Sequence, residues 1–81
     1  MMFPLSIFAF DREVFTGSAR SLSVPGALGR MQILPDHIPI VSSLVAGEVV
    51  IEKEDGTRET LPIESGILEV NKKEVVALVN F

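Results

Sequence analysis

Apolar and polar residues alternate along much of this chain in short segments, and turn-forming residues separate one segment from the next. Pairs such as Pro25-Gly26, Asp55-Gly56 and Ser65-Gly66 recur at short intervals. No segment keeps the apolar spacing of about 3.6 residues that an amphipathic helix requires. Short segments between such turns are typical of β-strands in a sandwich or barrel, so the pattern predicts an all-β fold.

The clearest predicted hairpin is the segment GEVVIEKEDGTRETLPI, residues 47–63. Val49 and Ile51 alternate with polar side chains before Asp55-Gly56 reverses the chain. Asp-Gly pairs tolerate the positive φ angles that tight hairpin turns need. The acidic residues around this turn are expected to lie at a solvated end of the hairpin.

A second hairpin is predicted between the segments GILEV and EVVALVNF, with the turn at residues 71–73. Successive side chains of a strand point to opposite faces. Ile67 and Glu69 are therefore expected on one face, and Leu68 and Val70 on the other.

The segment from Val75 to Val79 does not alternate, because all five of its residues are apolar. A strand of this kind needs cover on both faces. One face is expected to be core. The other is covered either by loops or a second sheet of the same chain, or by another protein.

Composition narrows the class of protein. The 81 residues are 47% hydrophobic, which is enough for one domain over residues 1–81. There is no cysteine, so the chain has no disulfide framework, thiolate zinc site or thiol nucleophile. The net charge of -4 is the wrong sign for a dedicated nucleic-acid-binding protein.

The N-terminal segment MMFPLSIFAF is apolar but meets charged residues at Asp11 and Arg12. A membrane-spanning helix needs roughly 20 apolar residues, so this segment is too short to cross a bilayer. It also lacks the layout of a signal peptide. It is expected to form the first strand, and any membrane association of the chain is expected to be peripheral.

His37 is the chain's only histidine, and Asp36, Ser42 and Ser43 are near it in sequence. A catalytic triad needs these groups within hydrogen-bond reach, and neighbours on a strand or turn point in different directions. One histidine with scattered carboxylates also lacks metal-ligand spacing. No catalytic or metal site is therefore predicted, and a binding or structural module is favoured over an enzyme.

The chain resembles the N-terminal β-sandwich domain of the epsilon subunit of rotary F-type ATP synthases. The resemblance is collinear over nearly the whole sequence. Its motifs are a Phe-Ser/Thr-Gly turn, a Pro-Gly pair, a glycine turn, a Leu-Pro-x-His-x-Pro stretch, a glycine before an amphipathic strand, and a Gly-hydrophobic-Leu-Glu-Val segment. They correspond here to Val14–Gly17, Pro25-Gly26, Gly29, Leu34–Pro39, Gly47 and Gly66–Val70.

The resemblance implies a flattened antiparallel β-sandwich or barrel of about ten short strands. It implies a non-catalytic subunit in the central stalk of a proton-translocating ATP synthase, with no cofactor. Such a subunit couples rotation of the membrane c ring to the catalytic head through contacts with the gamma subunit and the ring. It lies at the cytoplasmic face of the inner (plasma) membrane and is held there only through the complex.

Carried over by position, the resemblance assigns Arg30 to the contact with the c ring. It assigns five residues to the contact with gamma: Val14, His37, Val41, Ser42 and Val76.

Three positions depart from the family pattern. Relatives carry an acidic residue at the place of Arg30, so an acidic partner group is expected on this protein's own ring. Asp36 replaces the frequent glycine before His37, and Ser65 replaces the first of two glycines, so the local turn geometry is open to change at both places.

Family members commonly continue after this domain into a hairpin of two helices that restrains ATP hydrolysis. The sequence stops at Phe81. A minimal epsilon chain is expected, and this form of inhibition is expected to be missing only if 81 residues is the natural length of the protein. The alternative is a free-standing all-β ligand-binding or regulatory module whose resemblance to epsilon is superficial.

Overall fold

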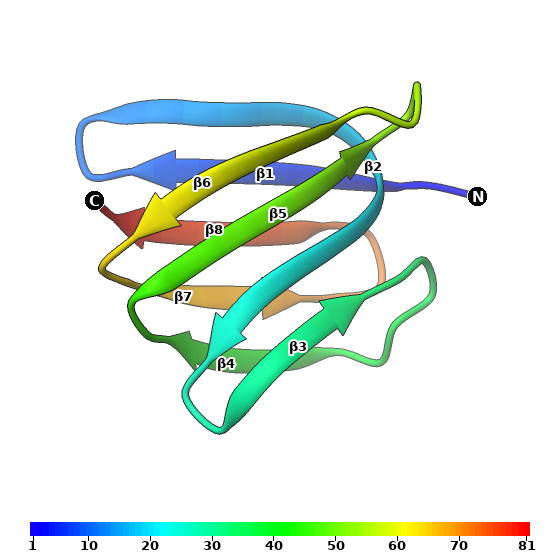
Figure 1. Cartoon of the computed structure of the whole chain (residues 1–81). Coiled ribbons are helices and arrows are strands. Elements are labelled where there is room, and N and C mark those ends of the chain that lie inside the picture. The colour runs from blue at the N-terminus through cyan, green and yellow to red at the C-terminus, as the bar shows by residue number, and fades with distance from the viewer.

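The computed structural model describes residues 1–81 and contains eight strands and no helix (Figure 1). The strands are β1 (Phe3–Ala9), β2 (Arg12–Gly26), β3 (Gly29–Ile33), β4 (Ile40–Leu44), β5 (Gly47–Lys53), β6 (Arg58–Ile63), β7 (Ser65–Val70) and β8 (Val75–Asn80). The all-β prediction is confirmed. Both predicted hairpins are present, as β5–β6 and β7–β8.

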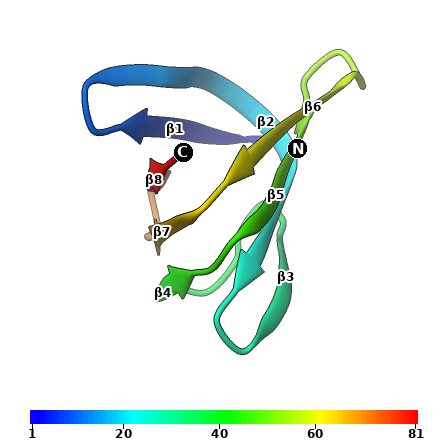
Figure 2. The same ribbon diagram turned by 60° about the vertical axis from the view of Figure 1, so that its left-hand side comes forward.

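The strands form two layers that share β2 (Figure 2). One layer has the order β1-β8-β7-β4, and the other contains β3, β2, β5 and β6. The first half of β2 pairs with β1, and its second half pairs with β3 and β5. The register with β5 shifts between Ala19 and Ser21. A bulge of this kind increases twist and bends a strand, which lets β2 pass from one layer to the other.

The strand number and one pairing differ from the expectation. The structure has eight strands where about ten were expected, because β2 is one 15-residue strand that serves both layers. The sheet is also mixed, since β1 and β8 pair in parallel from Leu5↔Val75 to Phe8↔Leu78. This pairing joins the two ends of the chain, and local sequence patterns carry no signal for it.

The core lies between the two layers and is made by alternate residues of every strand. Sixteen buried apolar side chains form one cluster, and no polar or charged residue is buried. In β7, Leu68 and Val70 are buried, whereas Ile67 and Glu69 are exposed, which confirms the predicted faces. In β8, Val75, Ala77 and Val79 are buried, so a single face of this strand serves the core.

The turn between β5 and β6 is held by Asp55. Its Oδ1 accepts hydrogen bonds from the Thr57 hydroxyl at 2.6 Å and from the Thr57 amide at 2.9 Å. These bonds favour the charged carboxylate and lower the pKa of Asp55. Next to the turn, Lys53 Nζ lies 3.1 Å from Glu59 Oε1. The acidic tip of the hairpin is thus a solvated turn, as expected.

The loop between β3 and β4 begins with a turn from Leu34 to His37. The His37 amide donates to the Leu34 carbonyl at 3.2 Å, and Asp36 has a φ angle of 65°. Pro35 in the second position and a positive φ in the third are typical of a type II turn. Asp36 therefore keeps a conformation that suits the glycine of relatives, so the substitution leaves a glycine-type turn in place.

Candidate functional site

The outward face of the layer β1-β8-β7-β4 is largely apolar. Val41 of β4 is 74% exposed, and Ile67 of β7 and Leu78 of β8 are each 53% exposed. Ile67 pairs directly with Leu78, and Leu78 pairs with Phe8 of β1. Side chains opposite one another on adjacent strands lie close together, so these three residues form a continuous apolar row.

A second row crosses the same face one step further along the strands. Val41 pairs with Glu69, Glu69 pairs with Val76, and Val76 pairs with Ser6. We call the two rows together the outer face; its residues are Ser6, Phe8, Val41, Ser43, Ile67, Glu69, Val76 and Leu78. Phe10, which is 98% exposed, follows β1 and lines a shallow depression beside Ile67 and Leu78. Exposed apolar patches of this kind mark sites of contact with other proteins.

Arg30 lies on the other layer, at the start of β3. Its Nε donates to Ser23 Oγ at 3.0 Å, and its Nη2 donates to the Glu48 carbonyl oxygen at 2.6 Å. The guanidinium is thus held over β2 and β5, although the residue is exposed. The tip of the same hairpin, Ala27-Leu28, is fully open to solvent, because Leu28 is 105% exposed.

Arg30, Val41 and Ser42 line one groove of about 350 Å³ between the β2–β3 hairpin and β4. The groove exists because β4 pairs with β2 only at Gly26↔Leu44, which leaves most of that edge of β4 open. Val41 and Ser42 are consecutive and point to opposite faces of β4. Ser42 is half-buried, and its hydroxyl donates to the Ser43 carbonyl at 3.2 Å.

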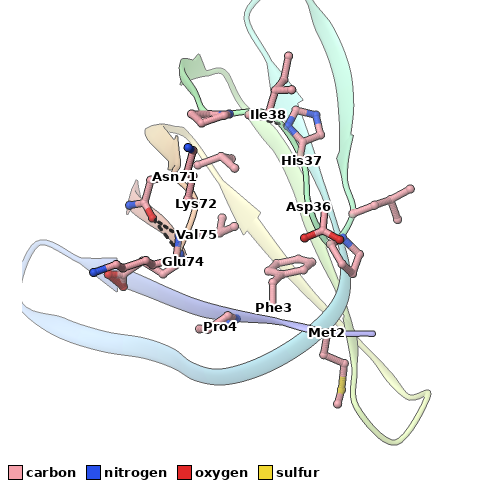
Figure 3. A pocket seen from close by; sticks show the side chains of 15 residues that line it. Met2, Phe3, Pro4, Asp36, His37, Ile38, Asn71, Lys72, Glu74 and Val75 are labelled. Atoms are coloured by element: carbon pink, nitrogen blue, oxygen red, sulfur yellow. Dashed lines mark hydrogen bonds between the residues drawn. The ribbon is translucent and has the colours of Figure 1, made fainter.

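His37 lies apart from this groove, in the loop between β3 and β4. It is half-buried, and its Nδ1 lies 2.8 Å from the Ile38 carbonyl oxygen, a contact that requires a proton on Nδ1. It lines a second groove, of about 450 Å³, formed by this loop, the start of β1 and the β7–β8 turn. In Figure 3, Phe3 lies in the middle of the groove, with Asp36 and His37 on one side of it and the β7–β8 turn on the other.

The β7–β8 turn that closes this second groove is held by Asn71. Its Oδ1 accepts hydrogen bonds from the amides of Lys73 at 2.8 Å and Glu74 at 2.9 Å. The wall of the groove is therefore a defined turn with charged side chains at its rim. No ion pair joins these side chains to Asp36 or His37.

Val14 lies outside both grooves. It occupies the position on β2 where the register with β1 shifts, so it has no partner on β1. It is half-buried and packs against the core cluster. Of the six residues assigned by resemblance, the structure thus brings Arg30, Val41 and Ser42 to one groove and Val41 and Val76 to one row.

The apolar residues Phe8, Phe10, Ile67 and Leu78 were missed as site residues at the sequence level. The signal was present for two of them. The alternation of residues 66–70 placed Ile67 opposite the core, and the unbroken apolar run from Val75 to Val79 required an outward apolar face.

The surroundings of the titratable side chains bear on the triad and metal sites considered from the sequence. No group of three or more His, Asp or Glu side chains is placed to hold a metal ion. His37 bonds to a backbone carbonyl, and its side chain meets neither Ser42 nor Ser43 in a hydrogen bond. None of the chain forms a helix of the length and apolarity that crossing a bilayer requires.

Residues 2–81 match the family of the ATP synthase delta/epsilon chain β-sandwich domain. The chain belongs to this family. Among its relatives is the ATP synthase epsilon chain of Dichelobacter nodosus, which is 34% identical over 76 residues, 94% of this chain and 53% of the relative. The epsilon chain of Polaromonas naphthalenivorans is 35% identical over 74 residues, 91% of this chain and 54% of the relative. This family member therefore spans about half the length of these relatives.

Solved structures show the same fold. A chain in the cryo-EM structure of the Euglena gracilis mitochondrial ATP synthase, with OSCP, F1 and c ring in rotational state 1, superposes with a TM-score of 0.86. It is 22% identical, and the match covers 98% of this chain and 49% of that one. A chain from the central stalk and c ring of the Tetrahymena thermophila mitochondrial ATP synthase has a TM-score of 0.81 at 9% identity, covering 100% and 65%. The fold of the family is thus common to distant ATP synthases.

Proposed function

We propose that this family member is a non-catalytic subunit of the central stalk of a rotary ATP synthase. It couples rotation of the membrane c ring to the catalytic head by binding the gamma subunit. The observation that carries the proposal is the family match over residues 2–81, since it accounts for nearly the whole chain. The same match argues against the alternative, a free-standing ligand-binding or regulatory module, because that alternative takes the resemblance to epsilon to be superficial.

The outer face is the surface proposed to bind gamma. It contains Val41 and Val76, two of the residues expected there, and extends them with Ile67, Leu78 and Phe8. Interfaces bury an apolar centre with a polar rim. The half-buried His37 lies at the β3–β4 end of this layer and is proposed to contact gamma at the rim, as is Ser42 in the groove beside Val41.

The c ring is proposed to meet the tip of the β2–β3 hairpin. Leu28 projects fully from this tip, and Arg30 follows it as a fixed positive charge, because the guanidinium is held by Ser23 and the Glu48 carbonyl. A fixed charge loses less conformational entropy on binding than a mobile one. Arg30 is therefore suited to an acidic group on the polar loops of the ring, with complementarity setting the fit.

The subunit is proposed to carry no cofactor and to make no bonds in the ATP synthase reaction. Its place is the cytoplasmic face of the inner (plasma) membrane, where gamma and the proton-translocating ring hold it. A β-sandwich with one continuous core deforms little, because tightly packed interiors have low compressibility. That rigidity suits a part that transmits torque between its partners.

Co-purification with gamma and the c ring tests the proposal. Wild-type chain should retain both partners, and Arg30→Glu should release the ring while keeping gamma. Arg20→Glu is the matched control, because it makes the same charge change at an exposed residue of β2 that lines neither of the depressions lined by Arg30. Failure of the wild-type chain to retain either partner would overturn the proposed function, and ring retention by Arg30→Glu would overturn the role of Arg30.

A further inference from the structure

The outer face carries one charge. Among the outward residues of β1, β4, β7 and β8, only Glu69 is ionisable. Val41 and Val76 flank it across the strands, and Ile67 precedes it on the same face of β7. Glu69 is exposed and takes part in neither of the two ion pairs and in none of the side-chain hydrogen bonds. The carboxylate is thus free for a partner.

Burial of this face by a partner would remove water from the Glu69 carboxylate. Burying an ionised carboxylate without a compensating group is strongly unfavourable, so an occupant with a purely apolar surface would bind poorly. An occupant with a cation opposite Glu69 would instead form a pair inside an apolar ring, where water screens the attraction less. The Glu69 charge therefore favours apolar partners that carry a cation opposite it over apolar partners that do not.

We infer that Glu69 determines the specificity of the outer face by pairing with a basic side chain, most suitably arginine, on the gamma subunit. Arginine fits because its planar guanidinium binds a carboxylate through two parallel hydrogen bonds and is weakly hydrated. The inference rests on the proposed function, because it takes gamma as the occupant. The apolar residues around Glu69 would supply the contact area, and the ion pair would fix the register of the two subunits.

The same charge argues against a second copy of this chain as the occupant. A twofold interface places one patch against the same patch of the partner copy. With Glu69 near the middle of the patch, two carboxylates would approach one another in an apolar setting, which repels. A heterologous partner with a complementary charge meets no such penalty.

The test measures binding of purified gamma subunit to wild-type chain and to Glu69→Gln, Glu69→Lys and Glu69→Val. Glu69→Gln keeps the shape and removes the charge, and it should weaken binding about tenfold or more; Glu69→Lys should weaken it further by repulsion. Glu54→Gln is the matched control, because Glu54 is an exposed acid in the β5–β6 turn, away from the outer face, and its change should leave binding unaltered.

Four outcomes would count against the inference. Equal binding by Glu69→Gln and wild type, or tighter binding by Glu69→Val, would show that only apolar area matters; gamma binding would then stand without the ion pair. No binding by the wild-type chain would overturn the proposed function together with this inference. Dimerisation of the chain alone, strengthened by Glu69→Gln in sedimentation experiments, would assign the face to a second copy.

Discussion

Asp36 is the only residue other than glycine with a positive φ angle. Left-handed backbone is unfavourable for residues with a Cβ, but aspartate tolerates it better than most because its short side chain can bond locally. The position lies between Pro35 and His37 in a turn closed by the His37 amide. The β3–β4 loop, which positions His37, therefore depends on the backbone tolerance of one residue.

Substitutions at Asp36 should follow this tolerance. Asp36→Gly should change the free energy of unfolding by about 1 kcal/mol or less, because relief of strain is offset by the greater freedom of glycine in the unfolded chain. Asp36→Val should destabilise by about 1–3 kcal/mol, since a β-branched residue strongly resists a positive φ. Urea denaturation measures the free energy of unfolding of both variants. Asp36→Asn is the control, because asparagine also tolerates a positive φ angle. Equal stability of the Val and Asn variants would contradict the argument.

Asp55 links pH to the stability of the β5–β6 turn. Its folded pKa lies below the ordinary value of 3.8, chiefly because of the Thr57 hydroxyl and amide. A lowered pKa means that the bonds stabilise the folded state fully at pH above the ordinary value and that this stabilisation is lost as pH falls through the folded pKa.

Thr57→Val removes the hydroxyl and keeps the amide and the branched shape. The pKa of Asp55 should therefore rise toward its ordinary value, although not fully, and NMR titration of the carboxyl carbon measures it. Thr60→Val is the control, because Thr60 is exposed on β6 and makes no side-chain hydrogen bond to Asp55. An unchanged Asp55 pKa in Thr57→Val would show that the hydroxyl is not the main cause.

At the scale of single elements, β7 and β8 show what sequence patterns can and cannot predict. The alternation of residues 66–70 identified the core face of β7 correctly, because the two-residue period is a property of the strand itself. The apolar run in β8 indicated that both faces need cover, and the structure leaves Leu78 on the open face. The same two-residue period places Val41 and Ser42 on opposite faces of β4, although the resemblance assigned both residues to the contact with gamma.

Other features of the elements depend on contacts between distant segments. The length of β2 follows from its pairing with four other strands, and the parallel contact of β1 with β8 joins the two ends of the chain. The bonds of Arg30 to Ser23 and to the Glu48 carbonyl depend on how β2, β3 and β5 lie side by side. Local periodicity contains none of this information, so these features could not be predicted from it.

The pairing of β7 with β8 leaves no room for a side chain at Gly66. A Cβ there would lie 2.7 Å from the Leu78 carbonyl oxygen and 3.3 Å from the Val79 Cα, both of which are backbone atoms. Gly66→Ala should therefore force the two strands apart and destabilise the chain by about 1–3 kcal/mol. At Gly17 a Cβ would meet only the Phe15 ring, at 3.5 Å.

Gly17→Ala is thus the matched control for Gly66→Ala, since it adds the same methyl group at ordinary contact distance. It should change the free energy of unfolding by about 1 kcal/mol or less. Denaturation of both variants under the same conditions gives the comparison. The lower freedom of alanine in the unfolded chain favours folding in both variants, so similar losses of stability would mean that crowding by β8 is not the cause of the loss at Gly66.

At the scale of the whole molecule, the layer β1-β8-β7-β4 has two faces with different tasks. The inner face supplies the core, and the outer face is the proposed interface. Neighbouring residues of β7 separate the two tasks: Leu68 is fully buried, whereas Ile67 is 53% exposed. Leu68→Ala should cost about 2–5 kcal/mol of stability, because it leaves a cavity in the core. Ile67→Thr keeps a β-branched residue and should cost about 1 kcal/mol or less.

Binding to gamma should show the opposite preference. Ile67→Thr, combined with Leu78→Thr in the same row, should weaken binding about tenfold or more, because apolar area at the centre of an interface is lost. Leu68→Ala, measured where it remains folded, should bind nearly as wild type does. Unfolding curves together with titrations of gamma measure both quantities on the same samples. If Ile67→Thr and Leu78→Thr reduced stability as much as Leu68→Ala while leaving binding intact, the outer face would be part of the fold and the interface would lie elsewhere on the molecule.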